Sequence, residues 1–301
     1  MYSFGVFFAV LAGITNFTGQ ILQKKAINAV APENRPQLMK HLIRTPVWIA
    51  GFLMVTLINV IFIAIAQSLI GAALIPGLTA SGFIVLGIGS VKLLGENIKK
   101  EEIIAIGLLV IGIIFISLSR LAIEGDFLRF QDNFFNVRIG LFTIIAFICW
   151  FTLYFQGKKM QKGKAIIMAL GTGFPFVLQN IWVQPLLLSF PALFGSGDIQ
   201  ALPVFVVSFL IVVLGGILGI IHFQHAMAEG NASIVIPIQQ IPQQVAPIFI
   251  YFVIYMLAVP GVWSYFYVIS GILLIIAAGF ILSRRQAELE KATQAGPGAT
   301  G

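Results

Sequence analysis

Nine apolar runs alternate with short polar connections along the chain, and each run is about 20 residues long. A helix rises about 1.5 Å per residue, so a run of this length crosses the roughly 30 Å hydrocarbon core of a bilayer. The runs are continuously apolar, which favours helices over the alternating strands of a membrane barrel. The predicted spans are residues 2–23, 47–67, 71–94, 102–120, 138–156, 165–189, 202–224, 231–257 and 262–283.

Composition supports the same fold class, an all-α polytopic membrane protein. Hydrophobic residues make up 59% of the 301 residues, charged residues make up 10%, and the mean hydropathy is +1.00. Soluble domains carry about 25% charged residues. The lipid bilayer is therefore an expected partner, in which a helix bundle satisfies its own backbone groups. The net charge of +7 predicts no nucleic-acid partner, because the basic residues lie between the apolar runs.

The basic residues are divided unequally between the two sides of the predicted bundle. Fifteen of the 18 lysines and arginines fall on one side, and only Arg120, Arg129 and Arg138 fall on the other. Cytoplasmic loops carry the excess of Lys and Arg. The chain is therefore predicted to lie in the plasma membrane with its N-terminus outside and its C-terminus in the cytoplasm.

Three segments of the first half recur in the same order in the second half. Ala9 and Gly13 match Ala169 and Gly173, Ile75-Pro76 matches Ile236-Pro237, and 107–120 matches 271–284, at offsets of 160, 161 and 164 residues. The predicted organisation is a four-helix repeat in 1–120, a linking segment with one helix in 121–160, a second four-helix repeat in 161–285 and a disordered tail in 286–301. Because one helix separates them, the two repeats are predicted to enter the membrane in opposite orientations.

An inverted repeat of this kind, four helices, one helix and four helices, is typical of secondary transporters. Their substrate sites lie near the membrane midplane between the repeats. Two nearly equivalent halves can exchange conformations, which exposes one site to each side of the membrane in turn. Duplication is also a general way in which membrane proteins grow, so the repeat alone is compatible with other functions.

Several short motifs resemble a known family of carriers. They are Gly19-Gln20-Ile21-Leu22-Gln23-Lys24-Lys25-Ala26 in the first span, Ile75-Pro76 in the third, and Leu93-Leu94-Gly95-Glu96 at its end. In these motifs the chain resembles the drug/metabolite transporter superfamily, namely its EamA-type carriers and, nearer in helix count, the NIPA-type magnesium transporters. The resemblance implies an inverted-repeat carrier of organic metabolites or of Mg²⁺. EamA-type members usually have ten helices, and Asn59 stands where the NIPA-type pattern has a glutamate.

Uncharged amides recur inside the predicted spans, where polar groups are costly and mark functional sites. Asn16 and Gln20 fall on one helix face of the first span, and Asn180 follows Gln20 by one repeat offset. Asn59 adds an amide to the second span. Such amides also join helices by hydrogen bonds, so each residue has a purely structural alternative.

The eighth span is the most unusual, because it combines three prolines with four glutamines. The residues are Pro237, Gln239, Gln240, Pro242, Gln243, Gln244 and Pro247. Each proline removes a backbone N–H and clashes with a carbonyl one turn earlier, so an interrupted helix is predicted. The third span has a lighter version around Pro76 and Thr79. Matching interruptions in two halves indicate a transport site, and a tolerated kink is the alternative.

A second group of polar residues ends the seventh span. His222, His225 and Glu229 share a helix face and are candidates for proton coupling or cation binding. Alternatively, Glu229 favours the start of the next helix, and water reaches both histidines at the cytoplasmic interface. Two histidines do not define a zinc site, so the metal is unknown. No cofactor is expected, and the motifs of membrane-embedded enzymes are missing from the sequence, so the chain is predicted not to be an enzyme.

The predicted function is gradient-driven or facilitative transport of a small polar organic metabolite by alternating access. The alternative is a NIPA-like transporter of magnesium or another divalent cation. The amide lining suits a polar or zwitterionic solute, and a homodimer is compatible with the sequence. The candidate substrate-binding residues are Asn16, Gln20, Asn59, Pro76, Thr79, Asn180, Gln239, Gln240 and Gln243.

Overall fold

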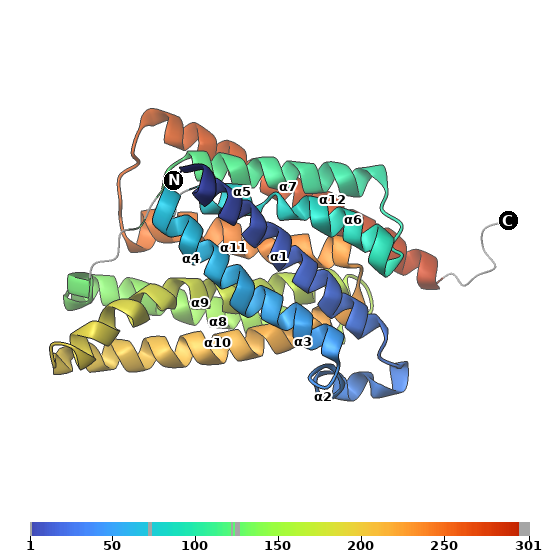
Figure 1. Ribbon diagram of the computed structural model, residues 1–301, viewed down its shortest axis with the longest axis horizontal. Helices are drawn as coiled ribbons and strands as arrows, with labels where there is room; N and C mark the ends of the chain where they lie inside the picture. Colours follow the sequence, from blue (N-terminus) through green and yellow to red (C-terminus); the bar gives the residue numbers. More distant parts are fainter. Residues whose placement is uncertain (1, 72–73, 122, 124–126, 295–301) are drawn as a thin grey trace.

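The computed structural model describes residues 2–71, 74–121, 123 and 127–294, and the regular secondary structure within them is entirely helical (Figure 1). The α-helices are α1 (Tyr2–Asn28), α2 (Leu38–Leu42), α3 (Pro46–Leu53), α4 (Asn59–Ile70), α5 (Ile75–Thr79), α6 (Gly82–Leu94), α7 (Lys100–Leu118), α8 (Asn133–Lys159), α9 (Lys164–Phe194), α10 (Leu202–Glu229), α11 (Ala232–Phe249) and α12 (Val262–Gln294). Short 3-10 helices cover Pro32–Gln37, Phe127–Gln131 and Ile199–Ala201, and π-helical turns cover Met54–Ile58 and Ile250–Ile254.

Eight helical segments of the described chain are long and apolar enough to cross a membrane, which supports an integral membrane protein. They correspond to eight of the nine predicted spans. The remaining prediction, 231–257, falls on α11 and the π-helical turn after it. The glutamines and prolines of α11 lower its hydropathy, so by length and composition it does not qualify as a span.

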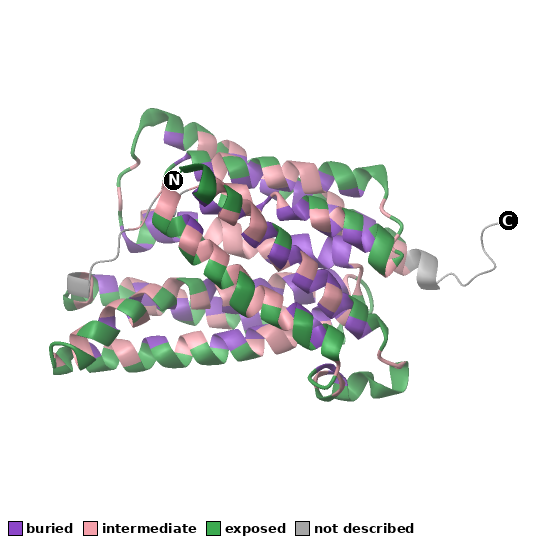
Figure 2. Cartoon of the chain, in the orientation of Figure 1, coloured by how far each residue is buried: buried purple, intermediate pink, exposed green. Residues whose placement is uncertain are grey.

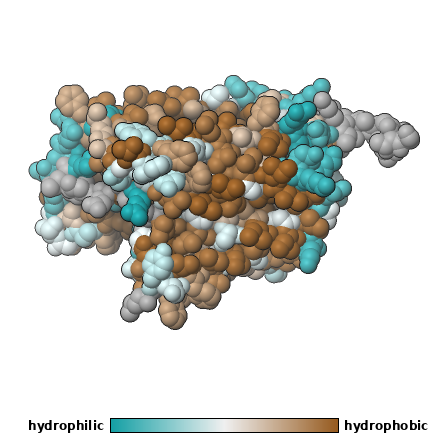
Figure 3. Space-filling model, turned by 90° about the horizontal axis from the view of Figure 1, so that it is seen from above, coloured by the Kyte–Doolittle hydropathy of each residue, from teal (hydrophilic) through white to brown (hydrophobic). Residues whose placement is uncertain are grey.

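Polar residues gather at the two ends of the molecule, and a broad hydrophobic band covers its middle on the face that Figure 3 shows. Lys24, Lys99, Lys158 and Lys164 lie close to the helix ends at one pole, which we call the basic end. Helix α1 starts at the other pole, which we call the opposite end (Figure 1). This distribution is the one that a bilayer requires, with charged groups outside the hydrocarbon.

The helices pack in two groups with α11 between them (Figure 1). In one group α1 packs against α3, α4, α5 and α6, and in the other α9 packs against α8 and α10. Helix α11 packs against α9 of the second group and also contacts α6, α7 and α12. Helices α7 and α12 pack against each other along one side. Figure 2 shows buried residues concentrated where α11 meets its neighbours.

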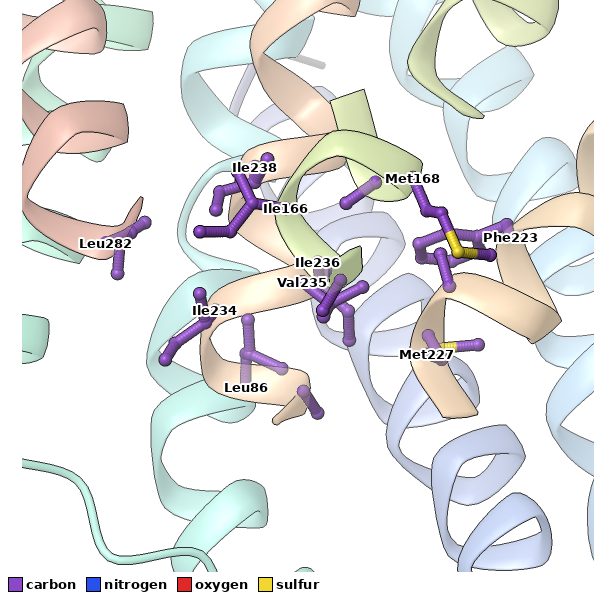
Figure 4. Close-up of a cluster of buried hydrophobic side chains, with 14 of the residues drawn as sticks. Leu86, Ile166, Met168, Phe223, Met227, Ile234, Val235, Ile236, Ile238 and Leu282 are labelled. Carbon is purple, nitrogen blue, oxygen red and sulfur yellow. The ribbon is translucent and has the colours of Figure 1, made fainter. Parts of the chain in front are cut away.

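The first half of α11 is the centre of the hydrophobic core. Ile234, Val235, Ile236 and Ile238 belong to one buried cluster with residues of α6, α9, α10 and α12 (Figure 4). Burial of a large aliphatic side chain contributes about 1.5–3 kcal/mol. The core therefore holds the basic-end half of α11 in place, and its glutamines follow directly after this buried segment.

Several pairs of helices approach closely at glycines, and three of these crossings bear on how the two halves are related. A methyl group at Gly13 of α1 would collide with the Thr79 carbonyl oxygen, and one at Gly173 of α9 would collide with the Gln239 carbonyl oxygen. Gly112 of α7 and Gly271 of α12 each meet the other's carbonyl oxygen. Small residues at these crossings let membrane helices pack backbone against backbone.

The interruption predicted for the eighth span is wrong, because α11 is a continuous helix through Pro237, Pro242 and Pro247. Each proline removes one N–H, and the remaining helical bonds maintain the helix, which becomes π-helical only from Ile250. The third span is interrupted as predicted, since α5 ends at Thr79 and α6 begins at Gly82.

The tail predicted to be disordered is helical over its first part. Helix α12 continues to Gln294, and Glu290 accepts a 2.6 Å hydrogen bond from the backbone N–H of Gly163. This bond ties the end of α12 to the start of α9, which the local composition of the tail does not reveal. Residues 295–301 lie outside the described residues.

Candidate functional site

An amide-lined cavity of about 540 Å³ lies between the two groups of helices. All nine residues predicted to bind substrate line it: Asn16, Gln20, Asn59, Pro76, Thr79, Asn180, Gln239, Gln240 and Gln243. They come from α1, α4, α5, α9 and α11, so both halves of the chain contribute. The volume falls in the range of small-molecule pockets.

Further polar and aromatic residues line the cavity and were not among the predicted site residues. They are Gln23, Phe52, Thr56, Phe176, Gln179, Phe223, Gln224 and Gln244. Gln23 continues the helix face of Asn16 and Gln20, and Gln244 belongs to the glutamine-rich span, so both carried a sequence signal. The phenylalanines carried none, because an aromatic residue in an apolar span resembles a lipid-facing one.

A π-helical turn shapes the wall formed by the second span. Residues Met54–Ile58 form this turn, and Val55, Thr56 and Asn59 in or next to it line the cavity. The Asn59 side chain donates to the Val55 carbonyl oxygen over 3.4 Å, and the Thr56 hydroxyl donates to the Phe52 carbonyl oxygen over 2.8 Å. Such turns insert one extra residue into a helix and occur often at functional sites.

The cavity is closed towards the basic end by a buried chain of polar side chains. Gln224 of α10 donates a 2.6 Å hydrogen bond to the Gln23 side chain of α1. The Trp48 indole of α3 donates to the Gln224 side-chain oxygen over 3.1 Å. All three residues are buried, so this chain forms a floor between the two halves.

Exposure of the lining residues rises towards the opposite end. On α11, Gln239 is buried, Gln243 is half-buried and Pro247 is exposed. On α1, Gln20 is buried and Asn16, which is nearer the opposite end, is half-buried. The cavity is therefore deepest next to its floor and opens towards the opposite end.

Beyond the floor, two charged side chains of the first half hold one turn of the second half. The buried amine of Lys24 donates to the carbonyl oxygens of Met227 and Gly230, at the C-terminal end of α10. The Glu96 carboxylate accepts hydrogen bonds of 2.6 and 3.0 Å from the backbone N–H groups of Ala232 and Ser233, which begin α11.

This arrangement, which we call the clasp, matches a cation to the end of one helix and an anion to the start of the next. Gly95 has φ +71°, a left-handed conformation that ends α6 and turns the chain before Glu96. The Leu93-Leu94-Gly95-Glu96 motif thus places its carboxylate on the other half of the chain.

A buried ion pair adds a second connection at the basic end. The Glu102 carboxylate accepts from the Arg285 guanidinium over 2.9 Å and from the Ser233 hydroxyl over 3.0 Å. Glu102 is fully buried, so its charge depends on these partners. The pair joins α7, α11 and α12 beside the clasp.

The candidate cation residues do not line the cavity. His222 accepts a 3.0 Å hydrogen bond from the Trp150 indole and stacks on Tyr154, and the Tyr154 hydroxyl lies 3.3 Å from the His225 ring nitrogen. Glu229 forms a 2.8 Å ion pair with Lys164. The described residues include no group of three or more His, Cys, Asp or Glu that could hold a metal ion.

A larger groove, of about 680 Å³, lies between α6 and α7, and its lining is apolar except for Lys92. Outward-facing isoleucines such as Ile84 and Ile103 form part of it, so it is continuous with the hydrophobic band. The hydrogen-bonding side chains line the amide-lined cavity instead. Comparison with protein-family models, curated proteins and solved structures finds no match for this chain.

Proposed function

We propose that this chain is a secondary transporter that moves a small polar organic solute by alternating access. One observation carries the proposal: an amide-lined cavity between two halves of a membrane bundle is open towards one end and closed at the other by bonds between those halves. Buried amides are costly in a membrane, and a cavity of this size has room for a small ligand that forms hydrogen bonds with them.

The basic end is assigned to the cytoplasm in this proposal. The excess of lysine and arginine at that end supports the assignment, as does the general bias of cytoplasmic loops. The N-terminus then lies outside and the C-terminus inside, and the cavity faces the exterior of the plasma membrane. Transport requires a second state, in which the floor and the clasp open and the opposite end closes.

The two halves are proposed to be inverted repeats, as the resemblance to the drug/metabolite transporter superfamily implies. Two equivalent helix crossings support this: Gly13 meets Thr79 in one, and Gly173 meets Gln239 in the other. The two glycines are separated by an offset of 160 residues, and Thr79 and Gln239 are separated by the same offset. The reciprocal contact of Gly112 and Gly271 is what a twofold axis between α7 and α12 requires. Related halves can exchange conformations at little cost.

The magnesium alternative receives no support from the geometry. His222, His225 and Glu229 are paired outside the cavity. Inside it, Asn59 offers a neutral amide, and Mg²⁺ sites are usually built with one or two carboxylates.

Uptake by cells that express the full chain tests the proposal. Amino acids, sugars, nucleosides and polyamines are offered in labelled form, with uptake compared with that of the empty host. Gln240→Ala and Gln243→Ala are expected to abolish any uptake that the wild type shows, with expression unchanged. Gln184→Ala is the matched control, since Gln184 lies on α9 and does not line the cavity. Full uptake by both cavity variants would refute the proposed site.

A further inference from the structure

The charge balance of the cavity restricts what it can bind. Eleven of the described residues that line it are asparagine or glutamine, and the described lining includes no ionisable side chain. An ion transferred from water into such a site would lose its hydration without gaining an opposite charge, which is unfavourable. Amides instead donate and accept hydrogen bonds at the same time, so they match uncharged groups that do the same.

Two of these amides have a buried side-chain oxygen without a hydrogen-bond partner in the described part of the chain. They are Gln20 and Gln239, with 6% and 3% of their surface exposed. Gln20 uses its amide nitrogen to donate to the Asn16 side chain, so its oxygen is the atom that remains free. Buried acceptors of this kind are unfavourable until a donor reaches them. A ligand that fits must therefore carry N–H or O–H donors.

The prolines of α11 add acceptors next to these side chains. Pro242 and Pro247 have no N–H, so the carbonyl oxygens of Ile238 and Gln243 lose the donor that an ordinary helix provides. Gln243 and Pro247 line the cavity. Ile238 does not line the cavity, so the backbone adds at most the Gln243 carbonyl oxygen to the side-chain acceptors of the site.

Three phenylalanines provide the apolar part of the lining. Phe176 and Phe223 meet edge to face with ring centroids 6.3 Å apart, and Phe52 stacks on Trp48. Trp48 is also the residue that donates to Gln224 in the floor, so rings and amides meet at the deep end of the cavity. Aromatic faces favour planar ligands, on which they stack.

From these features we propose that the solute is an uncharged nucleobase or nucleoside. A planar heterocycle satisfies the phenylalanine faces, and its edge presents the paired donors and acceptors that Asn and Gln side chains recognise. Ribose hydroxyls supply further donors for the free oxygens of Gln20 and Gln239. The inference rests on the proposed transport function and names the substrate class of the same cavity.

Thermal unfolding of the detergent-purified full chain tests this, since a ligand of the folded state raises the melting temperature Tm. Adenosine, uridine and adenine are compared with adenosine monophosphate, which keeps the ring and sugar but adds negative charge. Ribose, charged amino acids and MgCl₂ complete the panel. We expect a concentration-dependent rise in Tm with a nucleoside or nucleobase and none with the monophosphate.

Two variants and a control assign the effect to the cavity. Gln20→Leu and Gln239→Leu are each expected to raise the concentration needed for half of the Tm shift by roughly tenfold, the loss of about one hydrogen bond to the ligand. Gln184→Leu makes the same chemical change outside the cavity and should leave the shift intact. The Tm of each variant without ligand shows whether it is folded.

The outcomes separate the substrate class from the transport function. No shift with any nucleoside or nucleobase, or a larger shift with the monophosphate, an amino acid or Mg²⁺, would overturn the proposed class. If a different solute shifts Tm and the shift is lost in Gln20→Leu and Gln239→Leu, the binding site remains and only the class is wrong. Retained uptake in Gln240→Ala and Gln243→Ala would contradict the proposed site, whereas a solute that shifts Tm but is not taken up by cells expressing the wild type would contradict the transport function itself.

Discussion

Gln224 of α10 donates a 2.6 Å hydrogen bond to the side-chain oxygen of Gln23 of α1. The two residues lie 201 positions apart in the chain and belong to different halves of the bundle. Together with Trp48 they form the floor of the cavity. A floor made of hydrogen bonds can open without separating a large apolar interface, since water or a polar solute can replace each bond.

The Gln23–Gln224 bond is expected to contribute modestly to stability. Hydrogen bonds between membrane helices have coupling energies of about 0.6 kcal/mol on average, and up to roughly 1.7 kcal/mol. A double-mutant cycle with Gln23→Leu and Gln224→Leu, followed by reversible unfolding in mixed micelles, should give a coupling in this range. A coupling of zero would show that the two amides act independently.

The glycine crossings are expected to be far more sensitive. Gly13→Ala and Gly173→Ala each place a methyl group against a backbone carbonyl that cannot move freely, at a cost of about 1–3 kcal/mol. Gly107→Ala is the control, because no atom lies within 4 Å of the added methyl position. Alanine favours helix more than glycine does, so the control should be neutral or slightly stabilising.

The measurement is the Tm of each purified variant in the same detergent. If Gly13→Ala and Gly173→Ala unfold at the temperature of Gly107→Ala, the close crossings are not tight packing contacts. A fall in only one of them would contradict the proposed equivalence of the two halves.

The pattern of polar residues inside apolar runs predicted the lining of the cavity well. Asn16, Gln20 and Asn180 stood out because a buried amide needs a reason in a membrane, and all of them line the cavity. Their binding roles stay predictions. The pairing of Gln23 with Gln224 could not be predicted, because a local pattern does not show which distant helix an amide faces.

The backbone geometry of the helices was less predictable from the sequence than the residues that line the cavity. The π-helical turn at Met54–Ile58 has no sequence signal, since one extra residue in an apolar helix leaves its hydrophobicity unchanged. The proline spacing predicted an interruption in α11, but this helix is continuous because each proline removes only one backbone hydrogen bond. The reciprocal crossing relates Gly112 to Gly271 and Ile116 to Ile275 at an offset of 159, whereas sequence matching of these helices indicated 164. Apolar helices offer few distinctive residues, so their register is easily misaligned.

The buried Glu102–Arg285 pair is expected to be important for folding. Removal of the Glu102 charge leaves the buried Arg285 guanidinium with only the exposed Glu288, 3.4 Å away, as an ion-pair partner among the described residues. Breaking a buried ion pair costs about 3–5 kcal/mol. Glu102→Gln should therefore lower Tm strongly, and the double variant Glu102→Gln, Arg285→Gln should recover part of the loss. Glu101→Gln is the control, since Glu101 is exposed one residue earlier on α7. Equal Tm values for Glu101→Gln and Glu102→Gln would contradict the assigned role.

The most direct test of the account is whether the cavity can be reached from both sides of the membrane. Cys149 is the only cysteine, so Cys149→Ser gives a background in which Gln240→Cys reports on the cavity alone. A membrane-impermeant maleimide is applied to intact cells and to inside-out vesicles, with the native clasp, with Lys24→Gln or Glu96→Gln, and with the exposed control Lys25→Gln.

With the native clasp and in the Lys25→Gln control, we expect labelling mainly from the outside. Release of the clasp should raise the labelling rate from the cytoplasmic side and lower it from the outside, because one cavity cannot be fully open at both ends. Labelling that comes from one side only and does not change in Lys24→Gln or Glu96→Gln would contradict alternating access.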